Sequence, residues 1–407
     1  MENDIKSALA LLKRGQAPGN REILQEISVG SDFILDFWKQ KYLADYLSQG
    51  GSKIKFLTGR AGSGRTHFLE MLTMEAENMG YIPVYLSARE IWIHDFKEIY
   101  VAVLRQVNLM ERLQPSCCEV IRQLGYNPDD IPRDMTFVDY LSSQGQLDPL
   151  TKREIRQQLE QLFLANPLID NNFALACSLL TGSLLGHPTL EEPSRRLLLL
   201  SLEGSREARL PSLRRLGLSP SKITKYNARH MLRSLVEICR LAGYKGLVIA
   251  IDDMEILAGA DSIETIHYTR LKREDAYESI RELIDEIDTL KNTMFVFSFE
   301  RRLIDDDRAG LKSYQALWMR IQNEIEGTRF NRFADIVDLD RLIDEVYTPE
   351  NILEMSARLA SVINRLDEGA RPITLSTAEE IHARARFGKV ALPRRVNRTT
   401  VQEGVEQ

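Results

Sequence analysis

A candidate phosphate-binding loop is the clearest chemical feature of the sequence. From Lys53 to Leu72 the chain reads KIKFLTGRAGSGRTHFLEML, in which Gly59, Gly64 and Thr66 fit the pattern G-x-x-x-x-G-K-[ST]. Glycines let the backbone N–H groups of such a loop turn toward a phosphate, and the positive N-terminal end of the following helix adds to the attraction. The threonine hydroxyl is then placed to bind Mg²⁺. The sequence therefore predicts a site for ATP and Mg²⁺, against the alternative of a glycine-rich turn without a ligand.

Arg65 departs from this pattern because it stands where the pattern has a lysine. Lysine is a compact point charge, whereas guanidinium is planar, wider and permanently charged. Hydrolysis depends on charge placed where the transition state develops it, so the exchange threatens turnover more than binding. The residues expected to contact the nucleotide are Gly59, Arg60, Ala61, Gly62, Ser63, Gly64, Arg65, Thr66 and His67, although His67 could instead serve helix packing.

A second acidic site follows the apolar run GLVIAI, at Asp252 and Asp253. A carboxylate directly after a buried strand is typical of the second motif of P-loop ATPases, and Asp252 would hold Mg²⁺ there. Asp253 occupies the position at which many such ATPases carry a glutamate that polarises the attacking water, and aspartate is one methylene shorter. The alternative is a strand end followed by an Asp-capped helix. The direction of Glu255, two residues further on, stays open.

Two further sets of residues could complete an ATPase site. Ser298, at the end of TMFVFSFE, is the candidate for a polar residue that senses the γ-phosphate, as in AAA-type ATPases. We therefore expect Asp253, Arg65 and Ser298 to carry any hydrolysis. Candidate arginine fingers are Arg301, Arg302 and Arg320, and candidates for a second sensor or a nucleic-acid contact are Arg394, Arg395 and Arg398. For each arginine the competing interpretation is a solvated or salt-bridged side chain.

The elements that must position these residues alternate between strands and helices. Strands are predicted at 53–59, 81–88, 246–253 and 293–300, and helices at 65–80, 94–113, 226–242 and 273–290. This order favours an α/β fold with a P-loop (AAA-like) parallel sheet flanked by helices. The predicted parts are a helical lead-in (1–50), an ATP-binding core (51–107 and 226–345), a large helical insertion (108–225) and a helical, basic C-terminal region (346–407).

The composition and charge of the chain limit the kinds of protein it can be. The 407 residues are 43% hydrophobic and 28% charged, which is enough for a sizeable core, and the net charge is −6. The four cysteines lack metal-ligand spacing, and the N-terminal residues are too polar for a signal peptide. We therefore expect a cytoplasmic protein without membrane association. The most basic local segment lies at 195–215; it could be a solvated helix face or a contact for a polyanion or partner.

Several segments together resemble the ATP-binding proteins of BREX-type bacteriophage-defence loci, the BrxC/BrxD-like P-loop family, and lie close to its BrxD members. In chain order these segments are ALLKRGQAP, ISVGSDFILDFWKQKYLADYLSQGGSKIKFLTGRAGSGRTHFLEML, SAREIWIHDFKEIYVAVLRQV, ARHMLRSLVEICRLAGYKGLVIAIDDMEIL, DAYESIRELIDEI and DDDRAGLKSYQALWMRI. They follow the family's order and are spread along the chain from residue 10 to residue 321. Residues 108–225 and the end of the chain resemble it least.

The resemblance implies an AAA-like P-loop ATPase in an anti-phage defence or DNA-transaction system. Helicase-type or nuclease-type proteins would be its companions, DNA a possible partner, and self-association possible because AAA-type sites are often completed by a neighbouring subunit. It implies phosphate and Mg²⁺ binding at Gly59, Gly62, Gly64 and Thr66, and Mg²⁺ binding at Asp252. Arg65 and Asp253 depart from the family pattern. Three functions stay open: a slow or switch-like ATPase, a nucleotide-binding scaffold that does not hydrolyse ATP, and an interaction protein without nucleotide.

Overall fold

The chain folds into two compact units in the computed structural model. The first unit comprises Met1–His94, Val248–Ile287 and Met294–Gln407, and the second Asp95–Leu247 and Asp288–Thr293. The structure describes residues 2–30, 32–259, 266–322, 330–343, 345–365, 370–385, 387 and 390–403.

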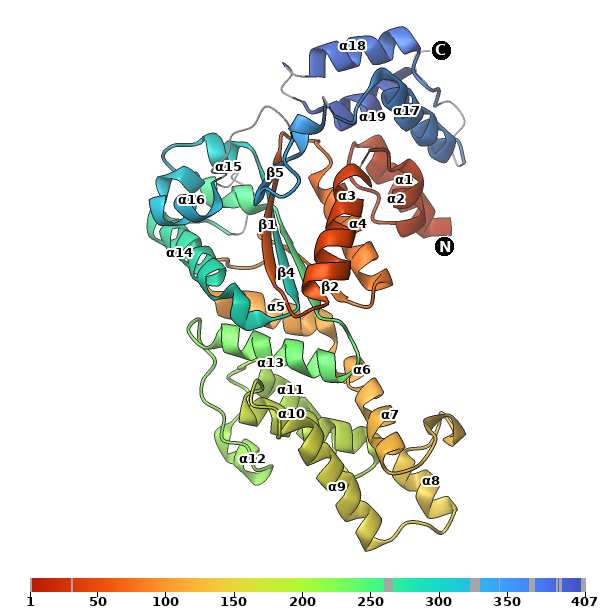
Figure 1. Cartoon of the computed structure of the whole chain (residues 1–407), viewed down its shortest axis with the longest axis vertical. Helices are drawn as coiled ribbons and strands as arrows, with labels where there is room; N and C mark the ends of the chain where they lie inside the picture. Colours follow the sequence, from red (N-terminus) through yellow and green to blue (C-terminus); the bar gives the residue numbers. More distant parts are fainter. Residues whose placement is uncertain are drawn as a thin grey trace. The chain divides into compact units, whose positions relative to one another are not determined.

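A five-stranded parallel sheet forms the centre of the first unit (Figure 1). Its strand order is β2 (Ile82–Ser87), β3 (Leu247–Asp252), β4 (Thr293–Glu300), β1 (Lys53–Gly59) and β5 (Ile336–Asp338). In the pairing of β1 with β4, Gly59 lies opposite Glu300, so both strands end at the same edge. Ligands of open parallel sheets bind beyond the carboxyl ends of the strands, which directs attention to this edge.

The central strand β3 is buried along its whole length because both faces of the sheet are covered. All residues of β3 are buried, as parallel strands require when helices cover both faces. On one face Leu57, Val248 and Val296 pack in a core shared with helices α3 (Asp32–Trp38) and α4 (Arg65–Asn78). On the other face Phe56 stacks on Phe297 at 5.5 Å, and α14 (Arg270–Glu286) covers this side (Figure 1).

Helices from both ends of the chain complete the first unit. The N-terminal part contains α1 (Glu2–Lys13), α2 (Arg21–Ile27) and a π-helix, η1 (Lys39–Leu47). Short helical segments surround the later strands: η3 (Met254–Ala258), α15 (Arg302–Asp305), η5 (Leu311–Ser313), α16 (Gln315–Ile321) and η6 (Leu339–Ile343). The C-terminal helices α17 (Pro349–Ile363), α18 (Leu375–Ala385) and α19 (Leu392–Glu403) pack on one another, and α17 also contacts α2.

The second unit is helical in its described residues. Its helices are α5 (Phe96–Val107), α6 (Leu109–Arg112), α7 (Gln114–Gln123), η2 (Pro128–Asp130), α8 (Phe137–Ser143), α9 (Pro149–Phe163), α10 (Asn171–Leu185), α11 (Glu192–Leu202), α12 (Leu210–Arg215) and α13 (Ala228–Leu241). Helix α10 contacts α7, α9, α11 and α13. Its apolar residues are spread around the helix, as expected of a helix enclosed by others.

The predicted α/β parallel-sheet fold is confirmed. Strand β5 was not predicted, because three residues at a sheet edge carry too short a pattern. The second unit contains all of the predicted 108–225 insertion and also α5 and α13, which the sequence analysis assigned to the core. The domain boundaries at 50, 107, 225 and 345 stay predictions. All four cysteines are free, and three of them are buried.

Candidate nucleotide-binding site

The loop between β1 and α4 has the backbone conformation that a phosphate-binding loop needs. Gly62 and Gly64 have φ angles of +81° and +91°, in the left-handed region that side chains rarely adopt. Within the described part of the chain, the N–H groups of these two glycines have no hydrogen-bond partner. Helix α4 begins directly afterwards at Arg65, so its first N–H groups also lack intrahelical acceptors. The loop therefore presents several free donors at the positive end of a helix.

Thr66 and Asp252 meet across the carboxyl edge of the sheet. The Thr66 hydroxyl donates a hydrogen bond of 2.8 Å to Oδ2 of Asp252. The same oxygen accepts a 2.8 Å hydrogen bond from the hydroxyl of Tyr85, a residue of β2. Two residues separated by 186 positions thus place a hydroxyl and a carboxylate oxygen together, and these are oxygen ligands of the kind Mg²⁺ takes.

Asp253 is held by β2 and the residues after it. Its φ angle is +61°, which is uncommon for a non-glycine residue and costs roughly 1 kcal/mol. One carboxylate oxygen accepts a 2.7 Å hydrogen bond from the Ser87 hydroxyl, and the other lies 3.1 Å from Nε of Arg89. Both oxygens of Asp253 are therefore engaged.

Arg65 is paired with carboxylates of its own chain. Its Nη1 lies 3.2 Å from Oε2 of Glu255, and its Nη2 lies 3.8 Å from Oε1 of Glu300. The exposed fractions of the Arg65 and Glu255 side chains are only 11% and 4%. Glu255 Oε2 also accepts a 3.0 Å hydrogen bond from the backbone N–H of Glu300. The structure thus gives Glu255 a direction that the sequence leaves open.

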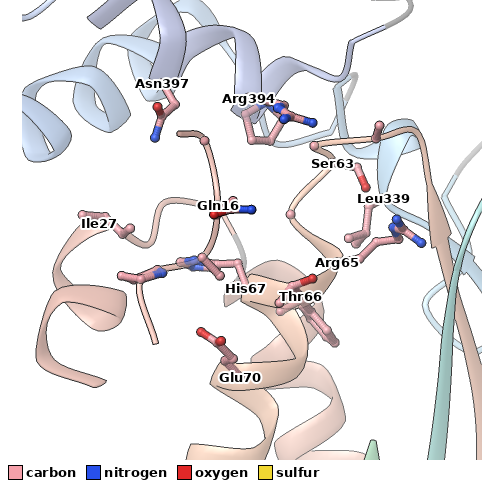
Figure 2. Close-up of a pocket in the computed structure, with 18 of the residues that line it drawn as sticks. Gln16, Ile27, Ser63, Arg65, Thr66, His67, Glu70, Leu339, Arg394 and Asn397 are labelled. Atoms are coloured by element: carbon pink, nitrogen blue, oxygen red, sulfur yellow. The ribbon is translucent and has the colours of Figure 1, made fainter. Parts of the chain in front are cut away.

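The loop opens onto a pocket of about 650 Å³ (Figure 2). The opposite wall comes from the segment after α1, including Gln16 and Pro18, and from α17 and α19, including Leu359 and Asn397. Figure 2 shows Arg394 and Asn397 reaching the pocket from α19, opposite His67 and Glu70 of α4. The pocket thus joins a polar floor at the loop to a partly apolar wall, as expected of a site for a cofactor with a charged and an aromatic part.

Burial in this pocket shifts the pKa values of two titratable side chains of α4. Burial raises the pKa of Glu70 to about 7, and the nearby negative charge of Asp252 acts in the same direction. Burial lowers the pKa of His67 to about 4, and its Nε2 lies 2.6 Å from the Ser28 hydroxyl. His67 is therefore neutral near pH 7, whereas Glu70 is divided between its neutral and charged forms.

Several buried polar atoms around the pocket lack partners, which tests whether a polar ligand fits there. In the described ranges, no hydrogen-bond partner is found for four side-chain atoms of the pocket lining: Ser63 Oγ, Glu70 Oε2, Arg394 Nε and Asn397 Oδ1. A buried polar atom without a partner costs free energy, and native structures contain few of them. Together with the free loop donors, these atoms fit a polar ligand that both donates and accepts hydrogen bonds, as a nucleotide does.

A comparison with protein families matches residues 2–403 to the BREX system ATP-binding protein BrxC/D family. The chain belongs to this family. A comparison with curated proteins finds no match. Within the described ranges, no helix has both the length and the apolar character that crossing a membrane demands.

Not every residue expected at the site of this BrxC/D-family protein lines the pocket. Ala61 to His67 line it, as do Asp253 and Arg394, whereas Gly59 and Arg60 do not. The Arg60 backbone N–H and side-chain Nε lie 2.8 and 3.0 Å from Oδ2 of Asp340. Its Nη2 donates to the Ala385 carbonyl. Arg60 therefore links the loop to η6 and α18.

Ser298 and the candidate arginine fingers also lie outside the pocket lining. Ser298 is fully buried, and its hydroxyl has no partner among the described residues. Each finger candidate is paired within its own chain: Arg301 with Asp338, Arg302 with Glu300 and Arg320 with Asp285. Of the three arginines of α19, only Arg394 lines the pocket. The catalytic roles assigned to these residues stay predictions.

Sequence reasoning missed much of the BrxC/D-family pocket. The residues without an assigned role include Gln16, Pro18, Glu70, Ser87, Arg89, Leu359 and Asn397. Ser87 and Arg89 had an available signal, because Ser87 ends β2 and Arg89 follows it, at the same edge of the sheet as the ends of β1 and β3. Glu70 also had one, since it lies one helical turn after Thr66 on α4. Gln16 and Asn397 had none, because only the tertiary fold brings the two ends of the chain to the loop.

Proposed function

We propose that this protein binds ATP with Mg²⁺ in the pocket between the loop, the segment after α1 and helix α19. The observation that carries this proposal is the 2.8 Å contact of Thr66 with Asp252, beside loop N–H donors that have no partner among the described residues. Thr66 would bind the metal directly and Asp252 through water. Mg²⁺ bound there would neutralise phosphate charge. The BREX system ATP-binding family supports the same conclusion.

The proposed activity is slow or partner-stimulated ATP hydrolysis in a bacterial anti-phage defence or DNA-transaction system, in the cytoplasm. In this proposal Arg65 faces the phosphates, Asp253 polarises the attacking water, and Ser298 senses the γ-phosphate. The alternative is a nucleotide-binding scaffold that does not hydrolyse ATP. It is favoured by a specific observation: Arg65 and both oxygens of Asp253 already have partners within the chain.

Phosphate release separates the two functions. The wild-type protein is incubated with Mg-ATP, with and without duplex DNA, and the variants Arg65→Lys and Asp253→Glu are measured beside it. The proposal predicts slow release that Asp252→Ala abolishes, and faster release from Arg65→Lys. Release that stays at the level of Asp252→Ala in the wild type and in both variants would support the scaffold.

We propose DNA and other defence proteins, of helicase or nuclease type, as partners. Residues 193–233 of the second unit contain ten Lys or Arg and two Asp or Glu. Seven of these cations are exposed and have no ion-pair partner in the part of the chain that the structure describes: Arg196, Arg206, Arg209, Arg214, Arg215, Lys222 and Lys225. A Cβ placed on Gly204 would lie 2.8 Å from Cβ of Ile223, so the chain beside Arg206 meets the chain beside Lys222. We call residues 204–226 the basic segment.

Self-association is also part of the proposal. Arg301, Arg302 and Arg320 are all engaged in ion pairs within the chain. If a second copy supplied one of these arginines to the nucleotide, that arginine would first have to leave its ion pair. Sedimentation with and without Mg-ATP would test this, and a monomer under both conditions would oppose it.

A further inference from the structure

Arg65 has two neighbouring carboxylates, and they hold it in different ways. Glu255 contacts Nη1 at 3.2 Å, whereas Glu300 contacts Nη2 at 3.8 Å and also lies 3.1 Å from Nε of Arg302. Glu255 is the more buried and the closer of the two. The planar guanidinium fork can address two acceptors at once, which a lysine ammonium on its flexible stem does less well.

Glu255 is itself fixed in place. Its Oε2 accepts the backbone N–H of Glu300 at 3.0 Å, and its Oε1 lies 3.8 Å from Nη2 of Arg89. The carboxylate is thus tied to the end of β4, to the residues after β2 and to Arg65. Moving the buried Glu255 carboxylate away from Arg65 would cost free energy, because the carboxylate would lose its hydrogen bond from the Glu300 N–H.

The loop donors and Arg65 line the same pocket, so a phosphate on the loop would share this pocket with the Arg65 side chain. A guanidinium cannot give the same N–H groups to Glu255 and to a phosphate oxygen at full strength. Phosphate and Glu255 therefore compete for one cation. The attraction between Arg65 and Glu255 is strong, because little solvent is present at the pair to screen it.

We propose that Glu255 is a positioning residue that competes with nucleotide phosphate for Arg65 and so sets the affinity of the site. Without nucleotide, Glu255 holds the guanidinium at the ends of β3 and β4. Binding of ATP requires Arg65 to exchange part of this contact for phosphate, and removing the charge of Glu255 should therefore tighten binding. This inference rests on the proposed binding of Mg-ATP.

A double-mutant cycle tests the competition. Calorimetry measures the dissociation constants of Mg-ATP and Mg-ADP for the wild type, Glu255→Gln, Arg65→Met and the double variant. We expect Glu255→Gln to tighten Mg-ATP binding about tenfold, which is about 1.4 kcal/mol. In the Arg65→Met background the same substitution should change the affinity by less than about twofold, because no guanidinium remains to be released.

The variant Asp253→Asn is the matched control. It removes one negative charge from the same pocket, but Asp253 is paired with Ser87 and Arg89 rather than with Arg65. If affinity for Mg-ATP rose only because the pocket had become less negative, it would rise equally with and without Arg65. Equal effects of Glu255→Gln in both Arg65 backgrounds would therefore overturn the inference.

Two further outcomes are decisive. Melting temperatures show whether each variant folds. If Glu255→Gln does not fold, Arg65→Lys is measured in its place. Tighter Mg-ATP binding by Arg65→Lys than by the wild type supports the competition, and weaker binding refutes it. If no folded variant binds Mg-ATP and the wild type does not either, the proposed function is wrong and the inference falls with it. If the wild type binds and the cycle shows no coupling, only the inference is wrong.

Discussion

At the scale of single residues, carboxylates outnumber cations around the loop. Asp252, Asp253 and Glu255 follow one another on a single turn, and Glu70 and Glu300 face them from α4 and β4. Asp252, Asp253, Glu255 and Glu300 have hydrogen-bond or ion-pair partners. Glu70 accepts a hydrogen bond from the backbone of Gly19, but its Oε2 has no partner among the described residues. Glu70 is therefore the residue at which a change of protonation should be easiest to observe.

Glu70 should make the protein less stable as the pH rises. Its pKa of about 7 in the folded chain exceeds its ordinary value of 4.5, so the native state binds more protons between these pH values. The free energy of unfolding then falls as the pH rises through this window. At pH 8 we expect Glu70→Gln to raise this free energy by on the order of 2 kcal/mol, with little effect at pH 4.5.

Urea denaturation at pH 4.5 and pH 8 measures this effect. The matched control is Glu77→Gln on the same helix, because Glu77 is exposed and its change should stay within about 0.5 kcal/mol at both pH values. Equal effects of Glu70→Gln at the two pH values would contradict the role assigned to burial.

At the scale of elements, the contact between the loop and helix α19 shapes the pocket. The backbone N–H groups of Ala391 and Arg394 donate to the carbonyls of Ala61 and Gly62 at 3.3 and 3.2 Å. The stem of the Arg394 side chain lies against Gly62 and also against Gly15 in the segment after α1. Three distant parts of the chain are thus fitted together around glycine residues.

Gly62 and Gly64 allow this contact to be tested with one substitution at each position. Both have positive φ angles, so alanine is strained at either position. At Gly62 the added Cβ would also lie 2.4 Å from Cβ of Arg394, whereas at Gly64 it would meet nothing within 4 Å. We expect Gly62→Ala to lower the free energy of unfolding by about 1–3 kcal/mol more than Gly64→Ala does. Thermal denaturation compares the two variants, and equal losses would show that α19 does not pack on the loop.

The sequence predicted the elements with strong local patterns and missed those that depend on distant contacts. Strands β3 and β4 were predicted from continuous apolar runs, and the glycine spacing before α4 identified the loop that follows β1. The pairing of Arg65 with Glu255 could not be predicted, because the register of two strands and the turn at Asp253 decide it. The same holds for the pocket wall from α17 and α19, about which local periodicity says nothing.

At the scale of the whole molecule, charge is distributed unevenly along the chain. The net charge is −6, yet residues 193–233 carry eight more positive than negative side chains. Such a concentration of exposed cations favours contact with a polyanion, and the phosphate backbone of DNA is the occupant proposed above.

Charge reversal in α12 tests the proposed contact with DNA. Arg214→Glu/Arg215→Glu changes two exposed arginines of the basic segment, whereas Arg153→Glu/Arg156→Glu makes the same change of net charge in α9 of the same unit. We expect the first double variant to weaken binding to a duplex at least about tenfold at ~50 mM salt and to flatten the salt dependence, because fewer counterions are released. Fluorescence anisotropy of a labelled duplex measures both. Equal losses in the two double variants, or an affinity that salt does not change, would refute the contact.

The most direct test of the central claim is calorimetric titration of the wild-type protein with Mg-ATP, beside Asp252→Ala as the variant that loses the carboxylate facing Thr66. The claim predicts saturable binding of ATP by the wild type, weaker without Mg²⁺ and lost or strongly reduced in Asp252→Ala. A folded wild-type protein that takes up no Mg-ATP at millimolar concentration would contradict it, and the loop would then be a structural turn rather than a nucleotide site.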